Sequence, residues 1–286
     1  MGINRRNFFK VLGATGMTLS VGGRLAAAPE ENPETEFKAM LYDATRCLGC
    51  RGCEFDCAFE NDLPEPEMVE DETIIRRTDS TRRSVINMHE TSIGPVYAKD
   101  QCMHCNDPAC ASACLTNAMK KTPEGPVTWD GEKCMGCRYC MISCPFDVPK
   151  FEYESTNPKI VKCTMCFHLV KEGEMPTCAF NCPGMAITFG SRREIIKEAR
   201  KRIHENPDKY VDHIYGEHEA GGTCWMYLSP VPFEELGFNT RVKQKSYPEL
   251  TKGFISAIAP VDILLPAFLL GIHEATKPKK NKEEEK

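Results

Sequence analysis

Apolar and polar positions after residue 183 follow regular patterns, and each pattern predicts a secondary-structure element. Apolar residues recur every fourth position at Ile195, Ala199 and Ile203. This period places them on one face of an amphipathic helix. Ser191 and Glu194 fit a capping box at the start of this helix, and Asn206-Pro207 ends it. Short, mostly apolar runs over 184–190 and 221–228 predict two strands.

A longer apolar stretch, Phe254 to Ile272, predicts a membrane-spanning helix. At about 1.5 Å per residue it is long enough to cross a bilayer core. Pro260, Pro266 and the single charge, Asp262, oppose this, because a carboxylate is costly inside a bilayer. The alternative is an apolar segment that packs on a partner. The stretch is followed by Lys277, Lys279, Lys280 and Lys282. Lysines in this position are typical of a cytoplasmic end.

The N-terminus resembles a twin-arginine (Tat) export signal and is set apart from the fold. Arg5 and Arg6 precede an apolar, glycine-rich run over 11–25, and Ala26-Ala27-Ala28 offers a cleavage site of small residues. Such signals serve proteins that fold and acquire cofactors before export. Pro29 would hinder cleavage, so removal of the signal stays open. The alternative is an amphipathic or disordered tail.

Composition excludes two classes of protein. Of 286 residues, 36 are Lys or Arg and 41 are Asp or Glu, which gives a net charge of −5. This balance provides no basic surface for nucleic acid, so no nucleic-acid partner is expected. A hydrophobic share of 41% and a mean hydropathy of −0.39 exclude a polytopic membrane protein.

Cysteine is unusually frequent, with 17 residues, and 16 of them fall into four groups. The groups are Cys47, Cys50, Cys53 and Cys57; Cys102, Cys105, Cys110 and Cys114; Cys134, Cys137, Cys140 and Cys144; and Cys163, Cys166, Cys178 and Cys182. Groups one and three have the bacterial ferredoxin spacing, in which three thiolates hold one 4Fe-4S cluster and the fourth reaches a neighbouring cluster. Groups two and four keep both ends of that spacing. Export would favour disulfides, but the repeated spacing predicts iron–sulfur clusters.

Residues beside the cysteines favour clusters over zinc and haem. Gly49, Gly136 and Gly52 stand directly before cysteines, where a side chain would crowd a cluster. Pro145 and Pro183 follow the fourth cysteines of groups three and four, as in the ferredoxin run. Structural zinc needs only four thiolates per site and is the alternative. Covalent haem is excluded, because no C-x-x-C is followed by His.

The spacing between groups predicts the organisation of the chain. Residues 115–133 separate groups two and three, with room for one helical turn and a β-hairpin. These two groups therefore predict one two-cluster module nested between groups one and four, which would pair as a second. Residues 60–72 hold seven carboxylates and are typical of an exposed insertion. This insertion is either a solvated loop or a docking surface for a partner.

Three further residues leave alternatives open. Cys224 belongs to no group and is either a buried inert thiol or a reactive or ligating one. His104 and His168 lie close to grouped cysteines. Each either tunes a cluster by hydrogen bonding or is an ordinary imidazole.

The chain resembles the four-cluster iron–sulfur subunits of membrane respiratory oxidoreductases in three motifs, QCMHCNDPAC at 101–110, CMGCRYCM at 134–141 and CPFDVPK at 144–150. That family serves dimethyl sulfoxide reductase, formate dehydrogenase, polysulfide reductase and the periplasmic hydrogenase-2 complex. Met40-Leu41-Tyr42-Asp43 and the C-terminal apolar segment are most similar to the hydrogenase-2 electron-transfer subunits. The resemblance covers about residues 1–273.

The resemblance implies four 4Fe-4S clusters, because all sixteen cysteines are present. We expect each module to exchange its fourth cysteines, as ferredoxins do. The predicted ligands are set A, Cys47, Cys50, Cys53 and Cys182; set B, Cys57, Cys163, Cys166 and Cys178; set C, Cys102, Cys105, Cys110 and Cys144; and set D, Cys114, Cys134, Cys137 and Cys140.

The expected fold class is α+β, with two ferredoxin-like dicluster modules, one nested in the other, a Tat signal and a C-terminal transmembrane helix. The expected segments are the signal (1–28), the first half of the outer module with the acidic insertion (29–95), the nested module (96–155), the second half of the outer module (156–190), an extension that packs on a partner (191–250), the anchor (251–273) and a charged tail (274–286).

The resemblance implies an electron-transfer subunit and not an enzyme. The sequence contains no P-loop, dinucleotide fingerprint or nucleophile with a convergent base. The clusters would relay electrons between a periplasmic catalytic subunit, a nickel–iron hydrogenase, and an integral membrane quinone-reactive subunit. The alternative catalytic partner is a molybdopterin oxidoreductase. A self-contained enzyme and a zinc scaffold are the competing classes. The expected location is the periplasmic face of the cytoplasmic membrane.

Overall fold

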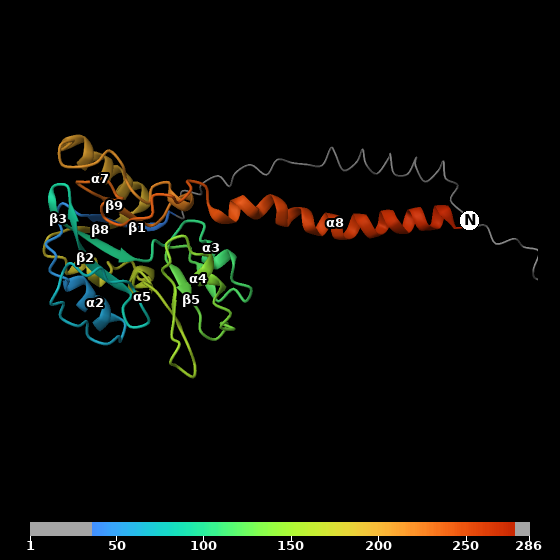
Figure 1. Cartoon of the computed structure of the whole chain (residues 1–286), viewed down its shortest axis with the longest axis horizontal. Coiled ribbons are helices and arrows are strands. Elements are labelled where there is room, and N and C mark those ends of the chain that lie inside the picture. The colour runs from blue at the N-terminus through green and yellow to red at the C-terminus, as the bar shows by residue number, and fades with distance from the viewer. Residues whose placement is uncertain (1–35, 278–286) are drawn as a thin grey trace, which may run out of the picture. The chain divides into compact units, whose positions relative to one another are not determined.

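The computed structural model describes residues 36–277, so the predicted signal (1–28) lies outside the described residues. Residues 36–250 form one compact unit (Figure 1). The strands are β1 (Lys38–Asp43), β2 (Ser84–Thr91), β3 (Gly94–Gln101), β4 (Met119–Lys121), β5 (Val127–Trp129), β6 (Lys150–Phe151), β7 (Ile160–Val161), β8 (Ile187–Ser191) and β9 (Trp225–Leu228). The helices are α2 (Gly52–Glu60), α3 (Ala109–Ser112), α4 (Tyr139–Ser143), α5 (Phe167–Lys171), α6 (Thr177–Phe180), α7 (Arg192–Glu205), the 3-10 helix η1 (Glu219–Gly221) and α8 (Tyr247–Thr276).

A three-stranded sheet with the order β8-β1-β9 forms the core of this unit. β1 pairs antiparallel with β8, with Met40 opposite Phe189, and parallel with β9, with Met40 opposite Trp225. All but the first residue of β1 are buried, as expected of a central strand covered on both faces. Helix α7 packs against β1 and β8 (Figure 1).

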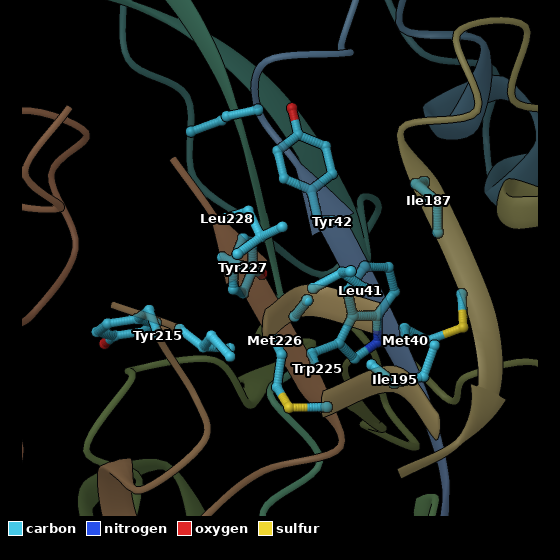
Figure 2. Close-up of a cluster of buried hydrophobic side chains, with 14 of the residues drawn as sticks. Met40, Leu41, Tyr42, Ile187, Ile195, Tyr215, Trp225, Met226, Tyr227 and Leu228 are labelled. Atoms are coloured by element: carbon cyan, nitrogen blue, oxygen red, sulfur yellow. The ribbon is translucent and has the colours of Figure 1, made fainter. Parts of the chain in front are cut away.

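The main hydrophobic core surrounds this sheet, and Figure 2 shows part of it. Tyr42, Trp225 and Tyr227 are at most 2% exposed. The hydroxyl of Tyr42 donates to the carbonyl of Tyr97 at 2.9 Å, and that of Tyr227 donates to the carbonyl of Lys99 at 3.2 Å. Both acceptors lie on β3, so these bonds attach the β2–β3 hairpin to the sheet.

A smaller core lies between the second and third cysteine groups. β4 and β5 pair as an antiparallel hairpin, with Met119 opposite Trp129, which confirms the hairpin predicted within 115–133. The buried members of this core are Cys110, Met119, Val127, Cys140 and Ile160. Two of them are predicted ligands, so this core and the candidate site share residues.

The predicted capping box is confirmed at the start of α7. Ser191 accepts a hydrogen bond from the backbone N–H of Glu194, and the Glu194 side chain accepts from the backbone N–H of Ser191. The strand predicted over 221–228 is corrected to the shorter β9. Gly221 and Gly222 have φ of +82° and +86°, so the chain turns there instead of extending.

The strand predicted over 184–190 is β8, which begins only at Ile187. The N–H of Met185 bonds to the carbonyl of Cys182 at 3.1 Å, so the preceding residues form a turn. Residues 191–250, expected to pack on a partner, supply α7 and β9 to the core of the chain itself. A long-range strand pairing of this kind has no local sequence signal.

Helix α8 confirms the predicted helix and extends beyond 254–272 at both ends. Among the described residues it is the one helix long and apolar enough to cross a membrane. Pro260 and Pro266 lie within it, and none of its residues is buried. At its start, Ser246 Oγ accepts a hydrogen bond from the N–H of Glu249 at 3.3 Å. Spanning of a membrane by α8 stays a prediction.

Candidate iron–sulfur site

The four cysteines of set A line one cavity. Cys47 and Cys50 lie in the loop after β1, Cys53 lies in α2, and Cys182 follows α6. Helix α2 packs on α6, which brings segments more than a hundred residues apart in sequence together. Tyr42 from β1 also lines this cavity, so the central sheet forms part of its wall.

The four cysteines of set B line a second cavity. Cys57 lies one helical turn after Cys53 on α2, so one helix contributes to both cavities. Cys163 and Cys166 lie between β7 and α5, and Cys178 lies in α6. The structure therefore brings together the residues of sets A and B as the sequence grouped them.

The remaining eight predicted ligands also gather in two sets. Cys105 of set C has Cys102, Cys144 and Cys110 as electrostatic neighbours. Cys140 of set D has Cys114, Cys134 and Cys137 as electrostatic neighbours. Helix α3 packs on α4, and these helices carry one cysteine of each set.

Thiols of different sets also approach one another. The neighbouring pairs are Cys178 and Cys53 for sets B and A, Cys163 and Cys102 for sets B and C, and Cys110 and Cys140 for sets C and D. These electrostatic interactions between neighbouring sets give the order A, B, C, D.

Burial raises the pKa of most of these thiols. The pKa of Cys53 rises to about 11 and that of Cys163 to about 12, with neighbouring thiols adding to the effect of burial. Cys114 differs. Burial also raises its pKa, but hydrogen bonds from the Met119 N–H and the Thr116 hydroxyl lower the pKa overall. Thiols with raised pKa values are protonated at neutral pH, so metal binding must release their protons.

The four cysteine loops share one backbone feature. The residue before the second cysteine of each group has a positive φ: Gly49 (+66°), His104 (+48°), Gly136 (+72°) and Met165 (+55°). In groups one and four the N–H of this residue donates to the first cysteine, from Gly49 to Cys47 Sγ at 3.5 Å and from Met165 to Cys163 Sγ at 3.3 Å. The left-handed conformation thus turns a backbone donor toward sulfur.

The donor set fits iron–sulfur clusters. Beyond the shared loops, the N–H of Ala186 donates to Cys182 Sγ at 3.3 Å and that of Met119 to Cys114 Sγ at 3.4 Å. Hydrogen bonds to sulfur are a usual means of tuning such clusters. Within residues 36–277 no three His, Cys, Asp or Glu side chains are close enough together to hold one metal ion. The thiols of set A and those of set B instead each line a cavity of their own.

A buried lysine that the sequence analysis did not single out lies beside sets A and B. Lys99, on β3, is 2% exposed, and its Nζ lies 3.7 Å from Cys53 Sγ. Burial alone would lower its pKa. The negative charges that Cys53, Cys178, Cys57 and Cys163 carry as thiolates instead raise the pKa of Lys99 above its ordinary value. No spacing rule marks Lys99, because only the folded hairpin brings it to these cysteines.

The two histidines occupy different environments. His104 is fully buried, and its Nδ1 accepts a hydrogen bond from the N–H of Val127 at 2.8 Å. Burial, reinforced by two nearby lysines, holds its pKa well below the ordinary value, so the ring is neutral. His168 lies at the surface, with Nε2 2.5 Å from Glu60 Oε1.

Cys224 lies outside all four sets, as the sequence indicated. It is fully buried, and Lys121 Nζ lies 3.1 Å from its Sγ. The side chain of Asn106 and the carbonyl of Gly125 lie farther away, at 3.6 and 3.7 Å. Complete burial fits the interpretation as an inert thiol.

The segment that follows the acidic insertion is attached to the helix that carries set A and set B ligands. Arg76 donates to both carboxylate oxygens of Glu54, at 2.5 and 2.8 Å, and the N–H of Ile86 donates to the same carboxylate at 2.6 Å. Glu54 directly follows Cys53 on α2. Residues 60–72 are mostly exposed, as predicted, whereas Arg76 has a structural role that the charge pattern did not reveal.

Comparisons with known proteins agree with this site. Residues 94–192, which include every cysteine of groups two to four, match the 4Fe-4S dicluster domain. The chain is 35% identical to the hydrogenase-2 operon protein HybA of Escherichia coli O157:H7, over 82% of this chain and 83% of that protein. It is 44% identical to a protein of Nitratidesulfovibrio vulgaris, over 97% and 78%. It is 30% identical to the iron–sulfur subunit of the nitrate-inducible formate dehydrogenase of Escherichia coli K12, over 66% and 67%.

Proposed function

Because the chain belongs to the HybA-like family of ferredoxin iron–sulfur subunits, we propose that it carries four 4Fe-4S clusters and transfers electrons between a catalytic oxidoreductase subunit and a membrane subunit. Family membership itself establishes 4Fe-4S clusters as cofactors and electron transport as the role. The observation that carries the count of four is the gathering of sixteen thiols into four sets, two of which line cavities of their own.

The ligand assignment follows the sets. Sets A and B share α2 and lie where it packs on α6, and sets C and D share the α3–α4 contact. This pairing supports one dicluster module nested inside the other. Cys57 lines the set B cavity and Cys182 lines the set A cavity, which supports exchange of the fourth cysteines.

The order A, B, C, D supports a linear path for electrons. Bound clusters supply one-electron redox chemistry, which none of the protein side chains needs to perform. The residues of the chain hold the clusters in place, exclude water and provide charges. For this role the chain requires no substrate site of its own.

Both ends of the path carry exposed apolar side chains, which suits contact with partners. Near set D, Leu115 and Ile142 are 84% and 80% exposed. Near set A, Leu48 and Met185 are 65% and 70% exposed. Exposed apolar residues clustered at a functional site are typical of interaction surfaces.

A nickel–iron hydrogenase is the proposed catalytic partner, because one relative is named for a hydrogenase-2 operon. The alternative is a molybdopterin oxidoreductase, supported by the formate dehydrogenase iron–sulfur subunits among the relatives. The proposed location is the periplasmic face of the membrane, after twin-arginine export, with α8 as an anchor beside a quinone-reactive membrane subunit.

The test is the metal and sulfide content of the full chain purified without oxygen. Four clusters predict about 16 iron and about 16 acid-labile sulfide per chain. A content near half of this, or zinc with little sulfide, would contradict the proposal. Cys57→Ser should reduce the iron and sulfide content, because it removes a ligand of set B.

Cys224→Ser is the matched control for this experiment. It changes a cysteine that is more completely buried than Cys57 but belongs to no set. We expect it to keep the full iron and sulfide content. A loss of clusters in this variant as large as that in Cys57→Ser would make Cys224 a ligand and invalidate the assignment of the sets.

A further inference from the structure

Lys99 places a buried ammonium group inside the candidate site. Its side chain is 2% exposed and lines the set B cavity together with Cys57, Cys163 and Cys178. Its Nζ lies 3.7 Å from Cys53 Sγ of set A. One ammonium group therefore borders two sets of cluster ligands at the point where α2 joins them.

No carboxylate neutralises this ammonium group within 4.0 Å in the described residues, where the thiol of Cys53 is the sole hydrogen-bond acceptor of its Nζ. Two other lysines near the site, the buried Lys162 and the partly buried Lys121, have backbone carbonyls as acceptors. Lys162 Nζ donates to the carbonyls of Val127 and Cys163, and Lys121 Nζ donates to the carbonyl of His104. An isolated buried charge is costly, so Lys99 needs a negative partner.

We infer that Lys99 is a shared counter-charge for the clusters of sets A and B, and that it raises the reduction potentials of both. A cluster with four thiolate ligands is negatively charged and gains one further negative charge when it accepts an electron. A fixed positive charge therefore stabilises the reduced form more than the oxidised form. This inference rests on the four clusters proposed above and makes Lys99 a tuning residue, not a ligand.

The location of Lys99 predicts a selective effect. Its Nζ lies 3.7 Å from Cys53 of set A, and its side chain lines the cavity of set B with Cys57, Cys163 and Cys178. No cysteine of set C or set D lines that cavity. Two of the four potentials should therefore respond to Lys99, and the other two should not.

The test is a redox titration of the full cluster-loaded chain, followed by electron paramagnetic resonance. In Lys99→Met two of the four midpoint potentials should become more negative, while Lys99→Arg, which keeps the charge, should shift them less. Lys209→Met, which removes an exposed lysine, is the charge-matched control and should shift none. Four unchanged potentials in a fully loaded Lys99→Met protein would overturn the inference.

A second measurement needs no substitution and covers the case in which Lys99→Met fails to load its clusters. The wild-type chain is labelled with 15N-lysine and the reduced clusters are examined by pulsed electron paramagnetic resonance. A hyperfine coupling from a lysine nitrogen is expected, and it should disappear in Lys99→Arg. Absence of the coupling in wild type would overturn the inference.

The two proposals fail in different ways. Wild-type iron and sulfide below the amount for four clusters would refute the proposed function, whatever Lys99 does. Full content with no response to Lys99 would refute only the inference. A purely structural role for Lys99 would change loading or stability without moving two potentials selectively.

Discussion

The left-handed residue before the second cysteine is the smallest unit that all four cysteine loops share. Two of the loops have glycine at this position, and the other two have His104 and Met165. The Cβ of these two residues makes the left-handed conformation energetically unfavourable. The position of Gly49 and Gly136 directly before a cysteine predicts that space beside a cluster is limited there. The structure adds a second reason, because a positive φ is required at both positions.

Substitution of these two glycines by alanine distinguishes backbone strain from steric overlap with a neighbouring side chain. At Gly136 (φ +72°) a new Cβ meets no atom within 4 Å, so Gly136→Ala should cost only about 1–2 kcal/mol from the left-handed backbone. At Gly49 (φ +66°) a new Cβ would lie 2.3 Å from the ring of Tyr97. Gly49→Ala should therefore be clearly more damaging. The measurement is the temperature at which the cluster absorbance bleaches, and equal bleaching temperatures for the two variants would refute this account.

At the scale of elements, the parts that the sequence predicted well are those fixed by neighbouring residues. The capping box of α7 and the β4–β5 hairpin depend on residues a few positions apart. The parallel pairing of β1 with β9 joins Met40 to Trp225, and no local pattern encodes it. The strand predicted over 221–228 was too long, because two glycines turn the chain.

The capping box gives a quantitative prediction for α7. Ser191→Ala removes the acceptor for the Glu194 N–H and should lower the free energy of unfolding by about 1 kcal/mol. Ser191→Asn, which retains a good capping side chain, is the control and should stay close to wild type. Thermal unfolding monitored by circular dichroism measures both. A loss in the Asn variant equal to that in the Ala variant would show that the hydroxyl is needed for another contact.

At the scale of the whole molecule, some residues of the candidate site can be predicted from the spacing of the cysteines. Others come close to the cysteines only when the chain folds. The cysteine spacing predicts the four sets, because each loop carries its own ligands and the ferredoxin exchange rule supplies the fourth. Lys99 could not be predicted from the sequence, because it lies beside Cys53 only after β3 has packed on the sheet. The ion pair of Arg76 with the buried Glu54 could not be predicted for the same reason.

Helix α8 is the proposed membrane anchor. Within residues 36–250, Ser246 Oγ donates to Asp107 Oδ2 at 2.5 Å. The residue that caps α8 is therefore attached to the loop between Cys105 and Cys110 of set C. None of the residues of α8 is buried within the described chain, although most of them are apolar. Such a surface requires either lipid or an apolar partner to cover it.

Truncation after Lys252 tests the anchor, because it removes the apolar part of α8 and leaves the Ser246 cap in place. A mid-membrane Asp262 costs about 2.5–3.5 kcal/mol unless it is sheltered, a cost that the surrounding apolar residues can offset. We therefore expect the full chain in the membrane fraction and the truncated, cluster-loaded chain in the soluble periplasmic fraction. A chain ending at Lys282 keeps the helix and its following lysines, and as the control it should remain in the membrane. If the Lys252 truncation stays fully in the membrane fraction, protein partners alone hold the subunit there, and α8 is then a segment that packs on a partner.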